Sequence, residues 1–468
     1  MNTMKKNRKK ERLVAWLVFG TIILIILAGL CVGGMFAYGQ YSEYRAQKKA
    51  LEEKAEAERI EMEETQKALE EAEKKALEEA AASAESFDQD SLDAIFSDEE
   101  ETEEVVEEET EDEELLEQVA DIVESMTIEQ KVAQLFFIRP EAITDVDVCT
   151  AAGEKTKAAL NDYPVGGIIY FADNIEDPEQ LSEMTKKLQS YAEEIEGVPV
   201  FIGIDEEGGS VTRIAQNDNF EVAKFDTMEE IGALGDTEKA YEAGNEIGKY
   251  LAEYGFNVNF APDADVITVP DNAIGDRSFG SDANAVSQMV LSYARGLSDA
   301  GILACAKHYP DHGAVSEDTH KESAIIDKSW DELEDNEIIP FKEVTKEKIP
   351  FIMVSHICVP AVTVDEIPSS LSGLLITDKL RGTIGYQGII ITDSLSMGAI
   401  SDNYSSKEAA VKALQAGVDM LLMPKDFKEA YEGVLGAIEE GTISEERINE
   451  SVVRIIKEKL KLNGENNR

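Results

Sequence analysis

Cysteine, histidine and positive charge are all scarce in this chain of 468 residues, and the shortages narrow the class of protein. The four cysteines, at positions 31, 149, 305 and 358, fit no zinc-binding spacing. They are too few and too scattered to predict a disulfide framework. Cys305 and Cys358 fall in apolar runs, so we expect them to be small buried core residues.

Basic residues are heavily outnumbered by acidic ones. The chain has 44 Lys and Arg residues against 96 Asp and Glu residues, a formal net charge of −52. The excess persists in residues 121–468, which carry 30 basic and 64 acidic side chains. Such a surface repels phosphate, which argues against nucleic acid as a partner. We interpret the excess as a means of solubility.

The chain has one long apolar run without any charge, at residues 13–38. It is long enough to cross the hydrocarbon core of a membrane, which is about 30 Å thick. Residues 1–12 hold six Lys and Arg residues, which predicts a cytoplasmic tail with the bulk of the chain outside. We therefore expect a single-pass signal anchor in the cell membrane. Cleavage near residues 37–39 is an alternative, and Leu30 is too large to favour lipid modification of Cys31.

Residues 39–114 differ in composition from residues 115–468 and predict a spacer. The stretch 42–82 is rich in Glu, Ala, Lys and Arg and lacks Gly and Pro, which is typical of a solvated helix. Residues 98–114 contain 13 acids in 17 positions and should be disordered by self-repulsion. We expect the spacer to give reach from the membrane, with partner binding as an alternative.

Residues 115–468 predict a single α/β domain with the architecture of a (β/α)8 TIM-like barrel. Short apolar runs alternate with longer amphipathic segments, and a repeated strand–helix order produces a parallel sheet. The expected strands are 133–138, 166–171, 199–204, 256–261, 302–306, 350–356, 388–391 and 420–423. The clearest expected helices are 177–197, 226–254, 283–300 and 330–347. In such a barrel the active site lies at the C-terminal ends of the strands.

Polar motifs follow several of these strands. Asp205 comes directly after the third run, before a glycine pair, with Arg213 further on, and this pattern suits recognition of sugar hydroxyls. Arg277 lies in a second motif after the fourth run and is a plausible hydrogen-bond donor to sugar oxygens. Asp393 closes the seventh run, where a carboxylate can attack an anomeric carbon.

The most informative motif follows the fifth run and holds three of the four histidines within 13 positions, residues 308–320. His308 stands at the strand end, next to Lys307, and should point at a substrate. His320 lies further along the loop, and Asp318 can hold one of its ring nitrogens while the other transfers a proton. A metal site built from these histidines is the competing interpretation.

Together these motifs resemble glycoside hydrolase family 3, in particular its NagZ-type β-N-acetylglucosaminidase branch. The most specific segment is KHYPDHGAVSEDTHKES, and ITDSLSM, IDEEGGSVTRI and IGDRSFGSD resemble further blocks of the family. The resemblance implies Asp393 as the nucleophile and His320 as the general acid/base, with Asp318 as its partner. It implies that the terminal sugar is bound by Asp205, Arg213, Arg277, Lys307 and His308. It also implies a retaining exo-glycosidase that needs no cofactor and acts on GlcNAc-containing muropeptides.

Three positions depart from the family pattern. Asp311 stands where the family usually has glycine, which predicts an altered loop or added charge beside the site. Thr319 replaces a serine, and Ser394 replaces a second acid after Asp393. A β-glucosidase, β-xylosidase or N-acetylglucosaminide phosphorylase on the same scaffold remains an alternative. A non-catalytic wall-binding protein is another, and it predicts the loss of the nucleophile or the acid/base.

Overall fold

The computed structural model describes residues 114–319, 323–363 and 365–465. The predicted cytoplasmic tail, anchor and spacer, residues 1–113, lie outside this part of the chain. Among the described residues, no helix is both long enough and apolar enough to cross a membrane.

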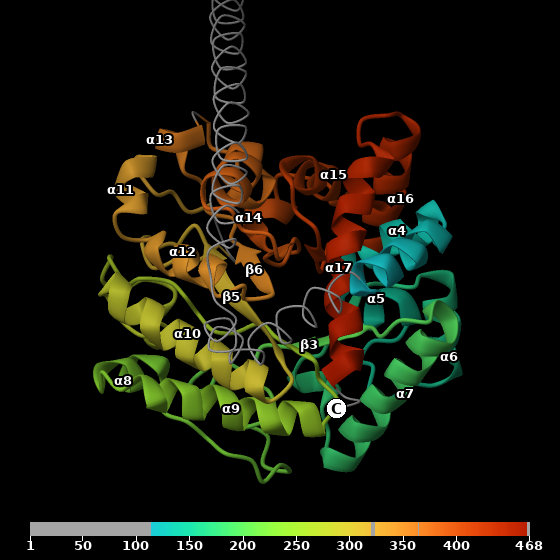
Figure 1. Cartoon of the computed structure of the whole chain (residues 1–468), viewed down its shortest axis with the longest axis horizontal. Coiled ribbons are helices and arrows are strands. Elements are labelled where there is room, and N and C mark those ends of the chain that lie inside the picture. The colour runs from blue at the N-terminus through green and yellow to red at the C-terminus, as the bar shows by residue number, and fades with distance from the viewer. Residues whose placement is uncertain (1–113, 320–322, 364, 466–468) are drawn as a thin grey trace, which may run out of the picture. The chain divides into compact units, whose positions relative to one another are not determined.

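The described residues contain eight strands that all run parallel (Figure 1). The strands pair in the order β7-β6-β5-β4-β3-β2-β1-β8. A parallel bridge between Ile391 and Met420 joins the two outer strands, so the sheet closes on itself. The bounds are β1 Phe136–Ile138, β2 Gly167–Ile169, β3 Phe201–Ile204, β4 Val258–Asn259, β5 Leu303–Tyr309, β6 Phe351–Val354, β7 Ile389–Thr392 and β8 Leu421–Leu422. The predicted parallel barrel is therefore confirmed, and each predicted run contains or overlaps its strand.

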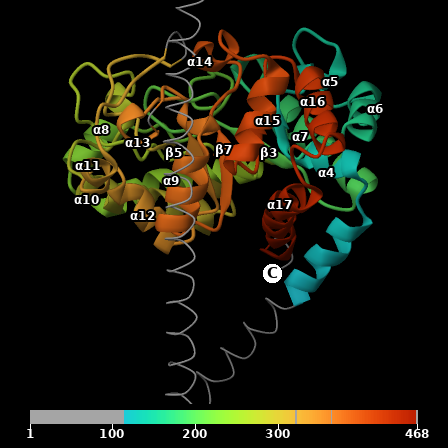
Figure 2. The same ribbon diagram turned by 90° about the horizontal axis from the view of Figure 1, so that it is seen from above.

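Helices surround these strands on the outside, as two views at right angles show (Figures 1 and 2). The α-helices are α4 Ile128–Gln134, α5 Glu141–Thr144, α6 Glu154–Asp162, α7 Pro178–Glu196, α8 Met228–Ala233, α9 Thr237–Glu253, α10 Ala283–Asp299, α11 Trp330–Glu334, α12 Ile339–Lys346, α13 Pro360–Thr363, α14 Gly398–Ser401, α15 Ser406–Ala416, α16 Phe427–Glu439 and α17 Glu445–Glu465. Short 3-10 turns are η1 Ala172–Asn174, η2 Gly275–Arg277 and η3 Ser369–Leu371, and η4 Leu374–Thr383 is a π-helix. This arrangement places every strand end beside a connecting loop.

Local sequence signals explain the helix ends. Helix α7 begins after Asp177, whose side chain accepts a hydrogen bond from the Gln180 amide, and it ends at Gly197 with a φ of 71°. The predicted helix 226–254 is wrong as a single element, because Gly235 takes a φ of 63° and Asp236 caps a new helix, α9. The predicted helix 330–347 is also divided, since Pro340 lacks an N–H and lies in the first turn of α12.

Aromatic side chains fill the inside of the barrel. The Phe137 ring lies 6.4 Å from the Phe201 ring and 5.1 Å from the Phe260 ring, measured between centroids. A Cβ atom at Gly203 would approach the Phe137 ring to 2.6 Å, so glycine in β3 makes room for this ring. The barrel is thus a packed core, and ligand chemistry is confined to its ends.

Candidate active site

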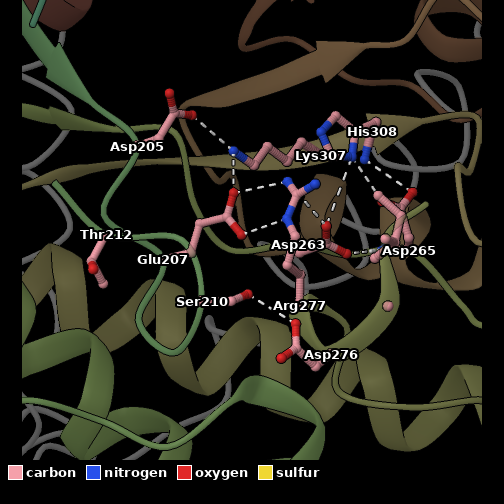
Figure 3. Close-up of polar contacts among 12 residues, drawn as sticks. Asp205, Glu207, Ser210, Thr212, Asp263, Asp265, Asp276, Arg277, Lys307 and His308 are labelled. Carbon is pink, nitrogen blue, oxygen red and sulfur yellow. Dashed lines mark hydrogen bonds and ion pairs between the residues drawn. The ribbon is translucent and has the colours of Figure 1, made fainter. Parts of the chain in front are cut away.

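The C-terminal end of the barrel gathers charged side chains from neighbouring strands (Figure 3). Asp205 and Glu207 follow β3, Asp263 and Asp265 follow β4, and Lys307 and His308 lie within β5. Five of these six are buried, and Asp205 is 19% exposed. Charges are seldom buried without a ligand or a partner, so their pairing decides what the cluster can do.

Lys307 is the central cation of this cluster. Its Nζ lies 3.0 Å from Asp205 Oδ1 and 2.6 Å from Glu207 Oε1. Burial alone would lower the Lys307 pKa, but the Glu207 and Asp205 carboxylates outweigh burial and hold the pKa above its ordinary value. Lys307 therefore stays charged and fixes Asp205 at the edge of the site. The structure brings these two predicted residues together.

Arg277 joins the same network through a carboxylate that the sequence analysis did not single out. Its Nε and one terminal nitrogen each lie 2.9 Å from an oxygen of Glu207, a bidentate pair, and the same terminal nitrogen lies 3.6 Å from Asp263 Oδ2. Burial alone would raise the Glu207 pKa, but Arg277 and Lys307 hold it below its ordinary value. Two predicted sugar-binding cations thus share one buried acid.

His308 is oriented by a second unpredicted acid, Asp265. The ring Nδ1 of His308 donates to Asp265 Oδ2 at 2.7 Å, so Nε2 is left for a ligand. Asp265 Oδ1 accepts the amides of His308 at 3.1 Å and His312 at 2.6 Å. Although burial opposes a charge on Asp265, the contact with His308 lowers the Asp265 pKa to about 2. Asp265 therefore anchors both histidines as a carboxylate.

Asp311 is fully buried. Its position decides between the two expectations for this residue, an altered loop or an added charge beside the site. Its Oδ1 accepts the Val266 amide at 2.6 Å, which ties the loop after β5 to the loop after β4. Burial and the Asp265 charge hold the Asp311 pKa well above its ordinary value. Asp311 therefore fixes the shape of the loop after β5. Its raised pKa favours the uncharged form over the expected extra negative charge beside the site.

Arg213 lies at the edge of the cluster, on the loop after β3. Its guanidinium is 3.7 Å from Asp205 Oδ2, and its centre is 5.7 Å from the centroid of the Phe171 ring. The loop is shaped by Glu206, which was not predicted. The buried Glu206 carboxylate accepts the amides of residues 213, 214 and 215 at 2.5–3.0 Å and the Tyr250 hydroxyl at 2.9 Å.

Asp393 lies at the end of β7, as predicted, and is partly exposed. Its amide donates to the Val354 carbonyl at 2.8 Å, and its Oδ1 accepts the Ser394 amide at 2.7 Å. His356, fully buried, donates from Nε2 to the Ser394 carbonyl at 2.9 Å, while Nδ1 contacts Ser370 Oγ at 2.8 Å. The fourth histidine therefore holds the backbone directly after Asp393, the predicted nucleophile.

Of the predicted acid/base pair, Asp318 lies on the loop after β5. Asp318 is partly exposed, and the next residue, Thr319, is buried. His320 lies outside the described residues, so its role stays a prediction.

The charged cluster also contains the group of described residues best able to hold a metal ion. Ligand atoms of Asp263, Asp265 and His308 lie within 4.8 Å of one another. His308 Nδ1 is already bonded to Asp265, and Arg277 approaches Asp263. This donor set is therefore occupied by internal contacts. Cys305 and Cys358 are buried and form no disulfide, as expected for core residues, and Cys149 is buried and free as well.

Comparisons with known proteins agree with this geometry. Residues 127–457 match the Glycosyl hydrolase family 3 N terminal domain. Beta-hexosaminidase A of Pseudoalteromonas piscicida is 34% identical over 329 residues, which cover 65% of this chain and 54% of the relative. Beta-hexosaminidase LpqI of Mycobacterium tuberculosis is 31% identical over 310 residues, covering 64% and 76% of the two chains.

Solved structures show the same relationship. A family 3 β-N-acetylglucosaminidase from Paenibacillus is 37% identical, with a TM-score of 0.68, and the match covers 72% of this chain and 64% of that one. The structure of M. tuberculosis LpqI gives a TM-score of 0.64 at 28% identity and covers 73% and 96%. Among the sequence relatives, this chain spans about half the length of the Pseudoalteromonas enzyme. With the four motifs, the match over residues 127–457 shows that the chain belongs to glycosyl hydrolase family 3 and to the NagZ-type group within it.

Proposed function

We propose that this chain is a retaining exo-β-N-acetylglucosaminidase that releases terminal GlcNAc from peptidoglycan fragments. The observation that carries the proposal is the position of Asp393, at the end of β7 on the barrel face that also presents Asp205, Lys307 and His308. The relatives named above are β-hexosaminidases and a β-N-acetylglucosaminidase, which supports the choice of sugar.

The terminal sugar would be held by the charged cluster. Asp205, Arg213 and Arg277 are each 19–23% exposed, and Lys307 and His308 stand beside them. Carboxylate and guanidinium groups whose positions are fixed by internal ion pairs can bind sugar hydroxyls without first being ordered, which favours affinity. Because Glu207 already holds Arg277 and Lys307, and Asp265 holds His308, binding requires little rearrangement of these three side chains.

The reaction would proceed in two displacements. The Asp393 carboxylate attacks the anomeric carbon, the bond to the leaving oxygen breaks, and His320, held by Asp318, gives that oxygen a proton. Water then attacks the anomeric carbon, His320 takes a proton from the water, and the bond to Asp393 breaks. The products are GlcNAc with retained configuration and the shortened fragment. No cofactor takes part in either step.

We also propose that residues 13–38 anchor the protein in the cell membrane with the barrel outside the cytoplasm, joined by the 39–114 spacer. The support is the charge pattern, six basic residues before an uncharged run. Protease added to intact cells should digest the barrel. Protection of the barrel until the cells are lysed would contradict this orientation.

The activity test uses the purified full chain in a mild detergent with 4-nitrophenyl β-N-acetylglucosaminide, the matching β-glucoside, and either substrate with inorganic phosphate. We expect release from the first substrate alone, without dependence on phosphate. Asp393→Asn should remain folded and lose activity on the order of 10⁴-fold or more, as catalytic residues typically do.

Each alternative has its own outcome. Release from the glucoside instead would keep the mechanism and reject the sugar. Formation of a sugar 1-phosphate would replace hydrolysis by phosphorolysis. No release from a folded protein would favour a binding role.

A further inference from the structure

We infer that His312 is a positioning residue, which acts through Thr319 on the segment that carries the acid/base pair. His312 Nε2 lies 2.9 Å from Thr319 Oγ1, and both side chains are buried. Thr319 directly follows Asp318 and directly precedes His320. The inference rests on the proposed function, because it assumes that these two neighbours deliver the proton.

The His312 end of this contact is rigid. Its backbone amide donates to Asp265 Oδ1 at 2.6 Å. Its ring packs edge-on against the His308 ring, with 5.8 Å between the ring centroids. A Cβ atom at Gly313 would lie 2.4 Å from the Val266 carbonyl oxygen, so the backbone after His312 is pressed against the loop after β4. The backbone of His312 is therefore held by the same acid that orients His308.

The Thr319 end is fixed at two points. Its side chain meets His312, and its carbonyl accepts the Ala399 amide of α14 at 3.3 Å. Helix α14 follows the Asp393 segment, so Thr319 joins the loop after β5 to the loop after β7. Consecutive Cα atoms are 3.80 Å apart, so a displacement of Thr319 is passed directly to Asp318.

His312 has the character of a support rather than a proton donor. It is 5% exposed, and burial, followed by the nearness of the His308 ring, lowers the pKa of His312. Among the described residues, Nδ1 has no hydrogen-bond partner, so Thr319 is the side chain to which the ring is hydrogen-bonded. A buried neutral imidazole with this single contact can hold the threonine hydroxyl in one place.

This role differs measurably from simple core packing. A misplaced general acid slows only those substrates whose leaving oxygen needs a proton, whereas loss of packing slows all substrates alike. The kcat/KM value isolates the first displacement, because it covers the steps up to cleavage of the glycosidic bond. A comparison of poor and good leaving groups therefore reveals the positioning.

The experiment measures kcat/KM of the full chain for phenyl and 2,4-dinitrophenyl β-N-acetylglucosaminides. Thr319→Val keeps the shape and removes the hydroxyl, and Thr319→Ser keeps the hydroxyl as a matched control. We expect Thr319→Val to lose about 10–100-fold on the phenyl substrate, part of the 10²–10⁴-fold typical of acid–base help, and to change little on the dinitrophenyl substrate. Thr319→Ser should stay near wild type on both.

An equal loss on the two substrates, or no loss on either, would overturn the inference. His312→Phe keeps a planar ring, removes the Nε2 contact with Thr319 Oγ1, and provides a second variant with the same expected result if Thr319→Val folds poorly. Combined with Thr319→Val it should add little further loss, whereas additive losses would contradict a shared contact. Failure of the proposed function is distinct, since the wild type itself would then release no phenol from either substrate.

Discussion

Two buried lysines at opposite ends of the barrel show how the same side chain serves different purposes. Lys307, at the C-terminal end of β5, contacts two carboxylates, and its pKa is held above the ordinary value. Lys459, on α17, donates to Gln134 Oε1 at 2.7 Å and lies 5.2 Å from the Phe201 ring centroid. Burial lowers the Lys459 pKa to about 7. Lys307 therefore stays charged at neutral pH, whereas Lys459 gains or loses its proton near pH 7.

The contrast extends to the surroundings of each lysine. Around Lys307 the acids outnumber the cations, and Asp205, Arg213 and Arg277 are each 19–23% exposed. At the other end, Asp419 is surrounded by Arg381, Arg447 and Arg454, and these arginines also donate to backbone carbonyls. These three arginines are 13–27% exposed, much like the site residues, so the two ends differ in their balance of acids and cations and not in exposure.

The largest expected effect tests the Lys307 side of this comparison. Lys307→Met leaves Glu207 and Asp205 without their shared cation, and breaking a buried ion pair typically costs about 3–5 kcal/mol. We expect a loss of that size in the free energy of unfolding, measured in urea, together with loss of glycosidase activity.

A double variant provides the control. Glu207 keeps its bidentate pair with Arg277, so the control acts on Asp205, whose contact at 3.0 Å is lost. Asp205→Asn in the same chain removes that carboxylate charge and should recover part of the stability without restoring activity. Equal stability of Lys307→Met and wild type would show that the network is not an electrostatic unit.

A smaller effect of opposite sign is expected at Lys459. Replacement of a poorly paired buried charge by an apolar group often stabilises a protein by about 1–4 kcal/mol, so Lys459→Met should raise stability at pH 6. The folded-state pKa is about 7, while the unfolded value is about 10.4, so between these pH values the unfolded state binds more protons. Wild-type stability should therefore rise with pH above 7, by up to about 1.4 kcal/mol per unit from this group.

The advantage of Lys459→Met should accordingly shrink between pH 6 and pH 9, as measured by urea unfolding of both proteins. A difference that stays constant with pH would mean that Lys459 does not titrate in this range.

The sequence predicted the scaffold well because barrel strands are short apolar runs bounded by loops. It located Asp393, Lys307 and His308 because strand ends of a barrel meet at one edge. It did not find Asp265, which lies 43 residues from His308, or the pairing of Gln134 with Lys459 over 325 residues. Pairs of this kind depend on how strands and helices align in space, and no local pattern encodes them.

Glu206 and Glu207 could have been found, because they directly follow Asp205. Adjacent side chains on an extended segment point to opposite sides, so a run of three acids at a strand end cannot serve one ligand alone. In the structure Glu206 turns to the backbone amides of the Arg213 loop and Glu207 turns to Arg277. The division of such a run into ligand-facing and supporting acids is decided by the loop that comes next.

The last of the expected stability effects, comparable in size to that of Lys459, concerns Asp265, the acid that links both histidines. Its pKa is lowered to about 2, against about 3.9 in an unfolded chain, so it stabilises the fold above about pH 4. That contribution, about 2.5 kcal/mol, should be lost as the pH falls from 4 to 2. Asp265→Asn keeps the shape and removes the charge, so it should be less stable than wild type at pH 5.

The difference between wild type and Asp265→Asn should narrow when urea unfolding is repeated at pH 3, because the wild-type carboxylate then begins to bind its proton. Other acids titrate in both proteins and cancel in this comparison. At pH 7 the same variant should raise KM more than it lowers kcat for the dinitrophenyl substrate, since His308 would lose the partner that orients it toward the sugar. A change confined to kcat would instead place Asp265 with the proton transfer, through His312 and Thr319.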